Sequence, residues 1–377
     1  MQPDKCCDIV IPVWNEYKLT KTCIESIRKN TDFPYRIIAV DNGSDSETKG
    51  YLESCKSSDP ANFALVRNEE NLGFVKASNQ GMRLSNAKYV CLLNNDTIVG
   101  EKWLGIMINV LENNSSIGLL NPLSNTFGRG PKDIIDIDDY SRKIALKKDR
   151  FVEAGQCIGF CMLMRRGVID RIGHLSENST FMFFEDTDYS IRARNMGFIC
   201  AIAMGAYVYH YEHKSGDKLG SKQGEIFQEN QKLFYKKWGE PLRIVYVSSV
   251  DPKTSRELLK RNIGEAISIS KKGNYVYIFQ RGKFKGDIDD FYESLGLVRF
   301  LNAQIFFKDK SFKLYCIYRI LTRRKKRFDA IFANDSDFYS LLKKIFFFHR
   351  IAIYRNLNEA DAVNLWSKRH KNARSVE

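Results

Sequence analysis

Short apolar runs alternate with amphipathic segments over roughly the first 240 residues. The runs CDIVIPV, YRIIAVD, FALVRN and YVCLLNND have the length and residue types of buried strands. Each is followed by a segment with helical periodicity, and we predict helices over residues 18–30, 46–56, 73–85 and 101–113. Strands that alternate with helices predict an α/β fold with a mainly parallel sheet covered on both faces.

A break in this pattern near Pro241 predicts two domains. The helical segment KQGEIFQENQKLFYKKWG ends just before this proline, and the strand-like LRIVYVSSV begins a second α/β series after it. That series continues with NYVYIFQRG, a helix near 288–296, and the strands FDAIFAND and IAIYRN. We therefore expect one domain at residues 1–240 and a smaller, Rossmann-like domain at residues 241–377.

The net charge of +14 is confined to the second of these domains. Residues 1–242 hold 31 Lys and Arg and 31 Asp and Glu, whereas residues 243–377 hold 28 and 14. A neutral first domain disfavours nucleic acid as a partner. The basic and aromatic stretches LTRRKKRF and IFFFHRIAIYR leave two alternatives, namely contact with anionic lipid and, the favoured one, a solvated face beside a buried strand.

Two further features of the sequence indicate the cellular compartment of the protein. No run reaches the roughly 18 apolar residues of a membrane span, and the start MQPDKCCD lacks the layout of a signal peptide. We expect a cytoplasmic chain, with peripheral contact at the inner face of the cell membrane as an alternative. The nine cysteines are scattered without tandem CxxC pairs, so we expect reduced, mostly buried thiols and no zinc site.

Polar residues follow three of the predicted strands, where ligands bind in parallel sheets. Asp41 can accept a hydrogen bond from a pyrimidine ring or a ribose, whereas Asp45 is expected to cap the next helix. Asp96 is a hard carboxylate suited to Mg²⁺ or Mn²⁺, although a lone aspartate at a strand end is more often a turn residue. The three segments are Pro12-Val13-Trp14-Asn15-Glu16, Asp41-Asn42-Gly43-Ser44-Asp45 and Asn94-Asn95-Asp96.

Five motifs in order over roughly residues 8–240 resemble the family 2 glycosyltransferases, particularly their rhamnosyltransferase-like branch. They are PVWNE, VDNGSD, NLGFxxxxNxG, LLNND and FFEDTDYSIRARNMG. The resemblance implies a GT-A fold and transfer of a sugar from a UDP- or dTDP-linked donor to a saccharide acceptor, either a surface glycan or a lipid-linked saccharide. The second domain resembles, much more weakly, the N-terminal half of GT-B glycosyltransferases. We expect either that the chain is a piece of a longer multidomain enzyme or that this domain serves docking only.

The resemblance also implies catalytic and metal-binding roles. Asp186 is carried over as the general base and Glu185 as its acceptor-orienting neighbour, although acids at a helix N-terminus are also expected for structural reasons. Asp96 and His210 are carried over as ligands of Mn²⁺ or Mg²⁺, with His213 as the rival histidine. The family usually has Asp-x-Asp where this chain has Asn-Asn-Asp, so one carboxylate is missing.

Donor binding is assigned partly from the strand ends and partly from the resemblance. Arg192 is included although exposed helical arginines are usually solvated. The predicted donor-binding residues are Pro12, Val13, Asn15, Glu16, Asp41, Asn71, Gly73, Asn79, Asn94, Asn95 and Arg192.

The implied reaction is inverting, because one base removes the acceptor proton while that oxygen attacks the sugar, and no covalent nucleophile is required. A nucleotidyltransferase is a competing interpretation. Enzymes of that class favour a glycine-rich first loop that contains lysine, and residues 12–16 form no such loop. A non-catalytic nucleotide-binding module is disfavoured by the assembled acids, which repel one another without a cation. The stretch Asn121–Val152 is predicted to be a loop or a loosely helical insertion, and Gly159 lies at the start of the following strand.

Overall fold

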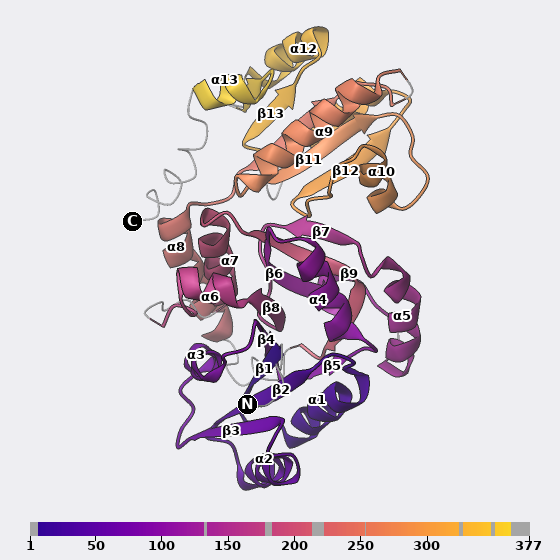
Figure 1. Cartoon of the computed structure of the whole chain (residues 1–377). Helices are drawn as coiled ribbons and strands as arrows, with labels where there is room; N and C mark the ends of the chain where they lie inside the picture. Colours follow the sequence, from indigo (N-terminus) through magenta and orange to yellow (C-terminus); the bar gives the residue numbers. More distant parts are fainter. Residues whose placement is uncertain are drawn as a thin grey trace. The chain divides into compact units, whose positions relative to one another are not determined.

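A computed structural model of the chain describes residues 7–131, 134–177, 183–212, 222–252, 254–323, 327–347 and 351–362 (Figure 1). The chain divides into two compact units, Met1–Gln231 and Lys232–Glu377. The division falls inside helix α8 (Lys222–Trp238), shortly before the boundary predicted near Pro241, which stays a prediction. No helix in the described part of the chain is long and apolar enough to cross a membrane.

A mixed sheet of nine strands forms the centre of the first unit within the described residues. Its order is β3-β2-β1-β4-β8-β6-β9-β5, and β7 pairs with β9. The β1–β2, β1–β4 and β2–β3 pairs are parallel, as the alternating pattern predicts, whereas β8 runs antiparallel to β4. The strands are β1 (Cys7–Val13), β2 (Tyr35–Asn42), β3 (Phe63–Asn68), β4 (Tyr89–Leu93), β5 (Thr97–Val99), β6 (Ile117–Leu123), β7 (Phe151–Ala154), β8 (Cys161–Arg165) and β9 (Ile199–His210).

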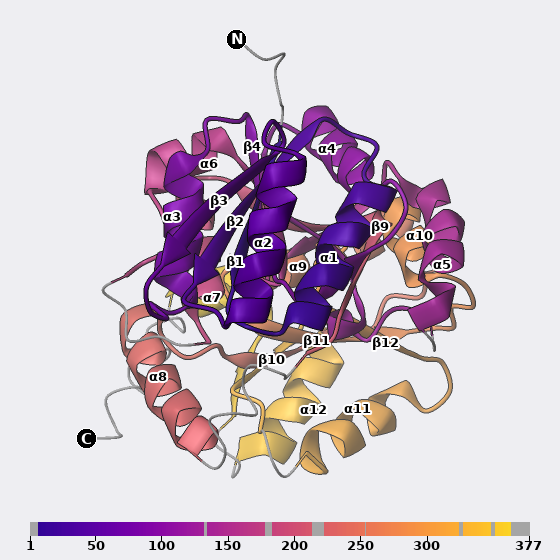
Figure 2. The same ribbon diagram turned by 90° about the horizontal axis from the view of Figure 1, so that it is seen from below.

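Helices cover both faces of this sheet (Figure 2). Helices α1, α2 and α4 bury their apolar sides in one hydrophobic cluster, and α3, α6 and α7 bury theirs in another. The mainly parallel, doubly covered α/β architecture is therefore confirmed. The helices are α1 (Tyr17–Asn30), α2 (Ser46–Ser58), α3 (Phe74–Leu84), α4 (Trp103–Asn113), α5 (Ile137–Ile144), α6 (Arg166–Ile172) and α7 (Glu185–Asn195).

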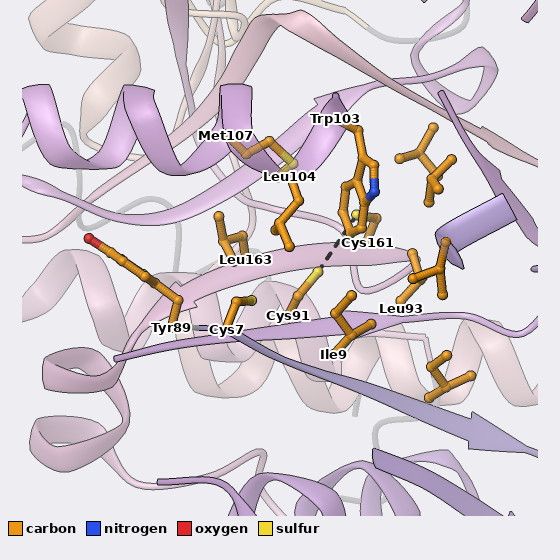
Figure 3. Close-up of a cluster of buried hydrophobic side chains, with 14 of the residues drawn as sticks. Cys7, Ile9, Tyr89, Cys91, Leu93, Trp103, Leu104, Met107, Cys161 and Leu163 are labelled. Atoms are coloured by element: carbon orange, nitrogen blue, oxygen red, sulfur yellow. Dashed lines mark hydrogen bonds between the residues drawn. The ribbon is translucent and has the colours of Figure 1, made fainter. Parts of the chain in front are cut away.

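The core between the sheet and α4 is apolar and buried (Figure 3). Side chains of β1, β4 and β8 face Trp103, Leu104 and Met107 of α4, and all three of these helix residues are fully buried. The Sγ atoms of Cys91 and Cys161 lie 4.0 Å apart in this core. The eight described cysteines are free and buried, which confirms the sequence interpretation for them.

Gly81, the last residue of the NLGFxxxxNxG motif, allows α3 to lie directly against β1. A Cβ atom at this position would be 2.3 Å from Cγ1 of buried Val10. We expect Gly81→Ala to lower the free energy of unfolding by about 1–3 kcal/mol, because the packed core must shift. Thermal unfolding followed by circular dichroism measures this. The control is Gly50→Ala in α2, where an added Cβ meets nothing within 4 Å, and equal melting temperatures for the two variants would contradict the expectation.

The second unit contains a five-stranded, all-parallel sheet of order β12-β11-β10-β13-β14. The strand order reverses between β10 and β13, which is typical of doubly wound folds and confirms the Rossmann-like prediction. Helices α9, α10 and α13 pack on one face, and α11 and α12 on the other. The elements are β10 (Arg243–Ser248), α9 (Arg256–Lys271), β11 (Tyr275–Arg281), α10 (Ile288–Ser294), β12 (Ala303–Lys308), α11 (Phe312–Leu321), β13 (Ala330–Ala333), α12 (Ser336–Phe346), β14 (Ala352–Tyr354) and α13 (Leu357–Ala362).

Candidate functional site

The loop after β1 has an unusual backbone conformation. Pro12 and Val13 lead into Asn15 and Glu16, whose φ angles are 58° and 60°. Such left-handed angles cost a non-glycine residue free energy and persist where neighbouring contacts impose them. Asn15 makes these contacts with the turn after β2. Its backbone N–H donates to Ser44 Oγ at 2.9 Å, and its Oδ1 accepts the N–H of the residue that follows Ser44 at 2.8 Å.

Asp41 at the end of β2 is fully buried, and both of its carboxylate oxygens are engaged. Oδ1 accepts the backbone N–H of Ser44 at 2.9 Å, and Oδ2 accepts a hydrogen bond from Arg67 at the end of β3. Gly43 permits the turn, since its φ is 74° and an added Cβ would lie 2.8 Å from the backbone of Glu70. Asp41 has no exposed surface in this arrangement, and its donor-binding role stays a prediction.

The predicted cap at Asp45 is confirmed. Its side chain accepts the N–H of Thr48 at 2.9 Å at the start of α2. This carboxylate is therefore explained by the helix terminus, as the sequence predicts.

Asn71 and Gly73 belong to a network beyond the ends of β2 and β3. Asn42 Nδ2 donates to Asn71 Oδ1 at 2.7 Å, and the same oxygen accepts the N–H of Gly73 at 2.9 Å. Asn42 Oδ1 accepts the N–H of Leu72 at 3.0 Å. The network fixes an exposed turn ahead of α3 at the carboxyl edge of the parallel strands, where a ligand role for Asn71 and Gly73 remains our prediction.

The turn after β4 brings Asp96 against His210. Strand β5 follows this aspartate and pairs with the end of β9, so that Thr97 lies opposite His210. Asp96 Oδ1 lies 3.2 Å from His210 Nε2, with side chains 12% and 15% exposed. Asn94 Nδ2 lies 3.3 Å from the same ring nitrogen. The structure thus brings together the two residues that we predict as metal ligands.

Asn95 connects this turn to the loop after β1. Its Nδ2 donates to Thr20 Oγ1 at 2.9 Å, and Thr20 Oγ1 in turn donates to the carbonyl of Asn15 at 3.4 Å. The hydroxyl of Thr20 in α1 therefore links Asn95, which follows β4, to Asn15, which follows β1.

The ring of His210 is fixed from several sides. Phe160 stacks on it with ring centroids 5.2 Å apart and planes 16° apart. Asn125 accepts the backbone N–H of His210 at 2.9 Å and donates to its carbonyl at 2.7 Å, and Thr126 Oγ1 lies 3.3 Å from Nδ1. The tautomer that carries its proton on Nδ1 and donates it to Thr126 would leave the Nε2 lone pair on the side of Asp96, as cation binding requires.

The Asp96–His210 pair fits an ion that takes most of its ligands from a substrate. Mg²⁺ is commonly held by one or two carboxylates, with phosphate oxygens and water completing its shell, and Mn²⁺ accepts similar donors. Within the described residues no three histidine, cysteine or acidic side chains form a complete cage. The rival His213 and the nearby Ser215 lie outside the described residues.

Asp186 lies in the first turn of α7 and accepts several hydrogen bonds. Its Oδ2 accepts the N–H of Gly159 at 3.0 Å, and its Oδ1 accepts the N–H and hydroxyl of Thr187 at 2.6 and 3.1 Å. Burial raises the pKa of Asp186 above its ordinary value, although these hydrogen bonds oppose the shift. A carboxylate with a raised pKa is a stronger proton acceptor.

Glu185 lies beside Asp186 in a less satisfied environment. Its Oε2 is buried and has no hydrogen-bond partner in the described part of the chain. Burial, and then the charge of Asp186, raise the pKa of Glu185 to about 7. Two residues earlier, Phe183 has a φ of 79°, an outlier for an aromatic residue. Raised carboxyl pKa values and backbone strain are both frequent at sites that move protons.

Gly159 and Phe160 connect the acid pair to the Asp96–His210 pair. The N–H of Gly159 donates to Asp186, whereas the ring of the next residue stacks on His210. The carbonyl of Phe160 also accepts the N–H of Asn94 at 2.8 Å. Because consecutive Cα atoms are about 3.8 Å apart, the predicted base and the predicted metal ligands border one region of the unit.

Phe74 of the NLGF motif reaches the same region. A Cβ added to Gly159 would lie 3.7 Å from the ring of Phe74 and 3.7 Å from Cβ of Asp186. Two motifs that are distant in the sequence therefore meet at Gly159.

Asn79 and Arg192 make their contacts within the scaffold. Asn79 is fully buried, and its amide donates to and accepts from the backbone of Leu175 at 2.9 and 3.0 Å. Arg192 pairs with buried Asp188 at 2.9 Å and donates to two backbone carbonyls at 2.7 and 2.9 Å. These contacts explain both residues without a ligand, and nothing in them adds support to the predicted donor contacts.

Several residues of this region are not predicted from the sequence. Arg67 follows an apolar run, so the strand-end rule that selects Asp41 also applies to it. Phe160, Asn125 and Thr126 act through His210, which is far away in the sequence, and no local pattern marks them.

The chain matches known proteins in its first unit. Residues 8–173 match the family model described as glycosyl transferase family 2. The glycosyltransferase GlyG of Streptococcus pneumoniae is 30% identical over 97 residues, which are 26% of this chain and 32% of that protein. An N-acetylglucosaminyltransferase of Azorhizobium caulinodans is 23% identical over 210 residues, 53% of each chain. The matches therefore span less than two thirds of these relatives.

A solved structure shows a looser similarity. The mannosyltransferase PcManGT of Pyrobaculum calidifontis, in complex with GDP-Man and Mn²⁺, is 15% identical with a TM-score of 0.44, over 71% of this chain and 65% of that one. The family match begins in β1, ends just after α6 and includes the strand ends that carry Asp41 and Asp96. Residues 8–173 are thus a glycosyl transferase family 2 domain, around which the first unit of the chain is built.

Proposed function

We propose that the first unit transfers a sugar from a nucleotide-diphosphate sugar to a hydroxyl of a saccharide acceptor, with inversion at the sugar carbon. The observation that supports this most is the connection of Asp186 to the Asp96–His210 pair through Gly159 and Phe160. It gives one region both a carboxylate suited to accept a proton and a donor set suited to a divalent ion.

In this proposal Asp186 accepts the proton of the acceptor hydroxyl as its oxygen attacks the anomeric carbon. Gly159 and Thr187 hold the carboxylate by hydrogen bonds, so that it can meet the acceptor in a fixed orientation. Glu185 has an unpartnered buried oxygen and is protonated for part of the time near neutral pH, so it can donate to or accept from an acceptor hydroxyl.

A Mn²⁺ or Mg²⁺ ion bound by Asp96 and His210 would neutralise the charge that develops on the departing nucleotide diphosphate. Asn94 lies against the same imidazole, and the loop at Asn15 and Glu16 is tied to the turn at Asn95 through Thr20. We assign this edge of the sheet to the donor nucleotide, either UDP or dTDP, and the acceptor to a surface glycan or a lipid-linked saccharide.

The reaction class can be tested without knowing the acceptor. We expect slow release of nucleoside diphosphate when the full chain is incubated with a panel of UDP- and dTDP-sugars and Mn²⁺, and no release when EDTA removes the metal. Release should depend on the sugar nucleotide supplied. Exchange of pyrophosphate into the nucleotide sugar, without release of nucleoside diphosphate, would instead support a nucleotidyltransferase.

Inversion has its own readout. Once an acceptor is found, a donor with an α-linked sugar should give a β-linked product, which nuclear magnetic resonance of the product determines. An α-linked product would refute the single-displacement mechanism while leaving the transferase assignment intact.

A further inference from the structure

Helix α11 of the second unit presents apolar side chains on the side that faces away from its core. Phe312, Cys316 and Ile320 are buried at 6%, 0% and 5% exposure and pack in one cluster with α12 and the sheet. At the intervening positions Leu314, Tyr318 and Leu321 are 69%, 64% and 46% exposed. The spacing of 314, 318 and 321 places these three side chains on one face of the helix, opposite the buried one.

A helix that is apolar on both sides is unusual at a protein surface. Surface helices normally direct charged and polar side chains to solvent, and a helix that is apolar all round is usually covered. Single exposed apolar residues are common and require no explanation, but here three of them form a continuous strip. We call Leu314, Tyr318 and Leu321 the outer strip.

The surroundings of the outer strip are basic. Of the described residues between 309 and 347, which include α11 and α12, seven are Lys or Arg and four are Asp or Glu, a net charge of +3. Lys313 lies 3.9 Å from Asp335. The exposed basic side chains that the structure describes there are Lys310, Lys313, Arg319, Arg327, Lys343 and Lys344. Helices α11 and α12 pack side by side on one face of the sheet, as Figure 2 shows, so their charges surround a common face.

We propose that this face of the second unit docks on an anionic lipid surface, with the outer strip inserted at the headgroup boundary. Leucine and tyrosine side chains suit that boundary, and flanking lysines can extend their ammonium groups to lipid phosphates. The positive charge selects an anionic bilayer over a second copy of this chain, whose same face would be equally positive. Docking does not depend on the proposed sugar transfer, so either proposal can fail without the other.

Vesicle binding of the full chain tests this proposal. The wild-type chain should sediment with vesicles of phosphatidylcholine and phosphatidylglycerol, and much less with vesicles of phosphatidylcholine alone. The variant Leu314→Ser/Tyr318→Ser/Leu321→Ser should bind the anionic vesicles on the order of 100-fold more weakly, because it loses most of the inserted apolar area. A matched control replaces three exposed apolar residues of the first unit, Leu84→Ser/Leu146→Ser/Met196→Ser, and should bind as the wild type does.

The electrostatic part has a separate variant. Lys310→Gln/Lys313→Gln/Lys344→Gln should reduce binding to the anionic vesicles by on the order of 100-fold, since each basic residue near such a surface contributes roughly fivefold. Unchanged circular dichroism and melting temperature would show that both triple variants fold. Wild-type binding by the outer-strip variant would overturn the proposal. The proposal would also be overturned by a combination of two results. The wild type would form a dimer in sedimentation velocity that the outer-strip variant does not form, and the two proteins would bind the vesicles equally.

Discussion

Asp186→Asn is expected to lower the rate of sugar transfer by about 10²- to 10⁴-fold, the usual loss when a positioned general base is removed. The amide has nearly the same shape but cannot accept a proton at neutral pH. Donor affinity should stay close to that of the wild type. The melting temperature should fall modestly, because the single amide oxygen can accept the hydrogen bonds of Thr187 whereas the amide NH2 group would face the N–H of Gly159. Steady-state turnover and donor binding by calorimetry measure the two effects separately.

The matched control is Asp287→Asn, which alters an aspartate that caps α10 in the second unit and accepts the N–H of Asp289 at 3.0 Å. Its turnover should be unchanged. Near-normal turnover of Asp186→Asn would show that Asp186 is not the base and only stabilises the first turn of α7.

The pH dependence gives an independent check on the wild-type chain. Asp186 must be ionised to accept a proton, so the rate should rise with pH through the pKa of this group. Because burial raises that pKa, the acid limb should lie above the range of an exposed aspartate. A rate that is flat through the weakly acidic range would contradict this role.

Asp96→Ala and His210→Ala should each weaken Mn²⁺-dependent binding of nucleoside diphosphate by about 10- to 100-fold or more. Each substitution removes one of the two protein ligands proposed for the ion, and little remains besides the phosphates and water. Calorimetry with UDP or dTDP, in the presence of Mn²⁺ and then of EDTA, separates this loss from metal-independent binding.

The control for the metal ligands is Asp149→Ala, which removes an exposed carboxylate that accepts a hydrogen bond from Asn109. It should bind nucleotide as the wild type does. His210 also stacks on Phe160, so thermal unfolding must show that His210→Ala remains folded. If both site variants bind Mn²⁺ and nucleotide normally, the metal assignment is wrong.

The regular part of the fold could be predicted because its signals are local. Strands β1 to β4 are apolar runs between helices with one apolar face, and the sequence places all four. Strand β9 is missed because ICAIAMGAYVYH contains alanines and a glycine, which favour strands weakly, and its strand form depends on pairing with β6, β7 and β5. Helix α11 is missed because FKLYCIYRIL is apolar on both sides and gives no amphipathic period.

The insertion predicted between Asn121 and Val152 is only partly irregular. Strand β6 extends into it to Leu123, the short helix α5 lies within it, and β7 begins at Phe151. The predicted loosely helical character is therefore correct for Ile137–Ile144, whereas the strand ends inside the segment are missed.

In the candidate site, too, some residues could be predicted from local sequence and others could not. Asp41 and Asp96 could be selected because each follows an apolar run, which is visible in a few neighbouring residues, whereas the role of Asp186 came from the family resemblance. Their partners could not be predicted in the same way. Asp41 meets Arg67 only through the pairing of β2 with β3, and His210 reaches Asp96 only because β9 pairs with β5.

The unpartnered oxygen of Glu185 implies a trade-off between stability and activity. A carboxyl whose pKa rises from 4.5 to about 7 on folding holds its proton more tightly in the native state than in the unfolded chain. The free energy of unfolding therefore falls as the pH rises from 4.5 to about 7, by at most about 1.4 kcal/mol for each pKa unit of the shift. Near neutral pH the unit therefore keeps an acid that weakens its own fold, a cost in stability of the kind that functional sites often carry.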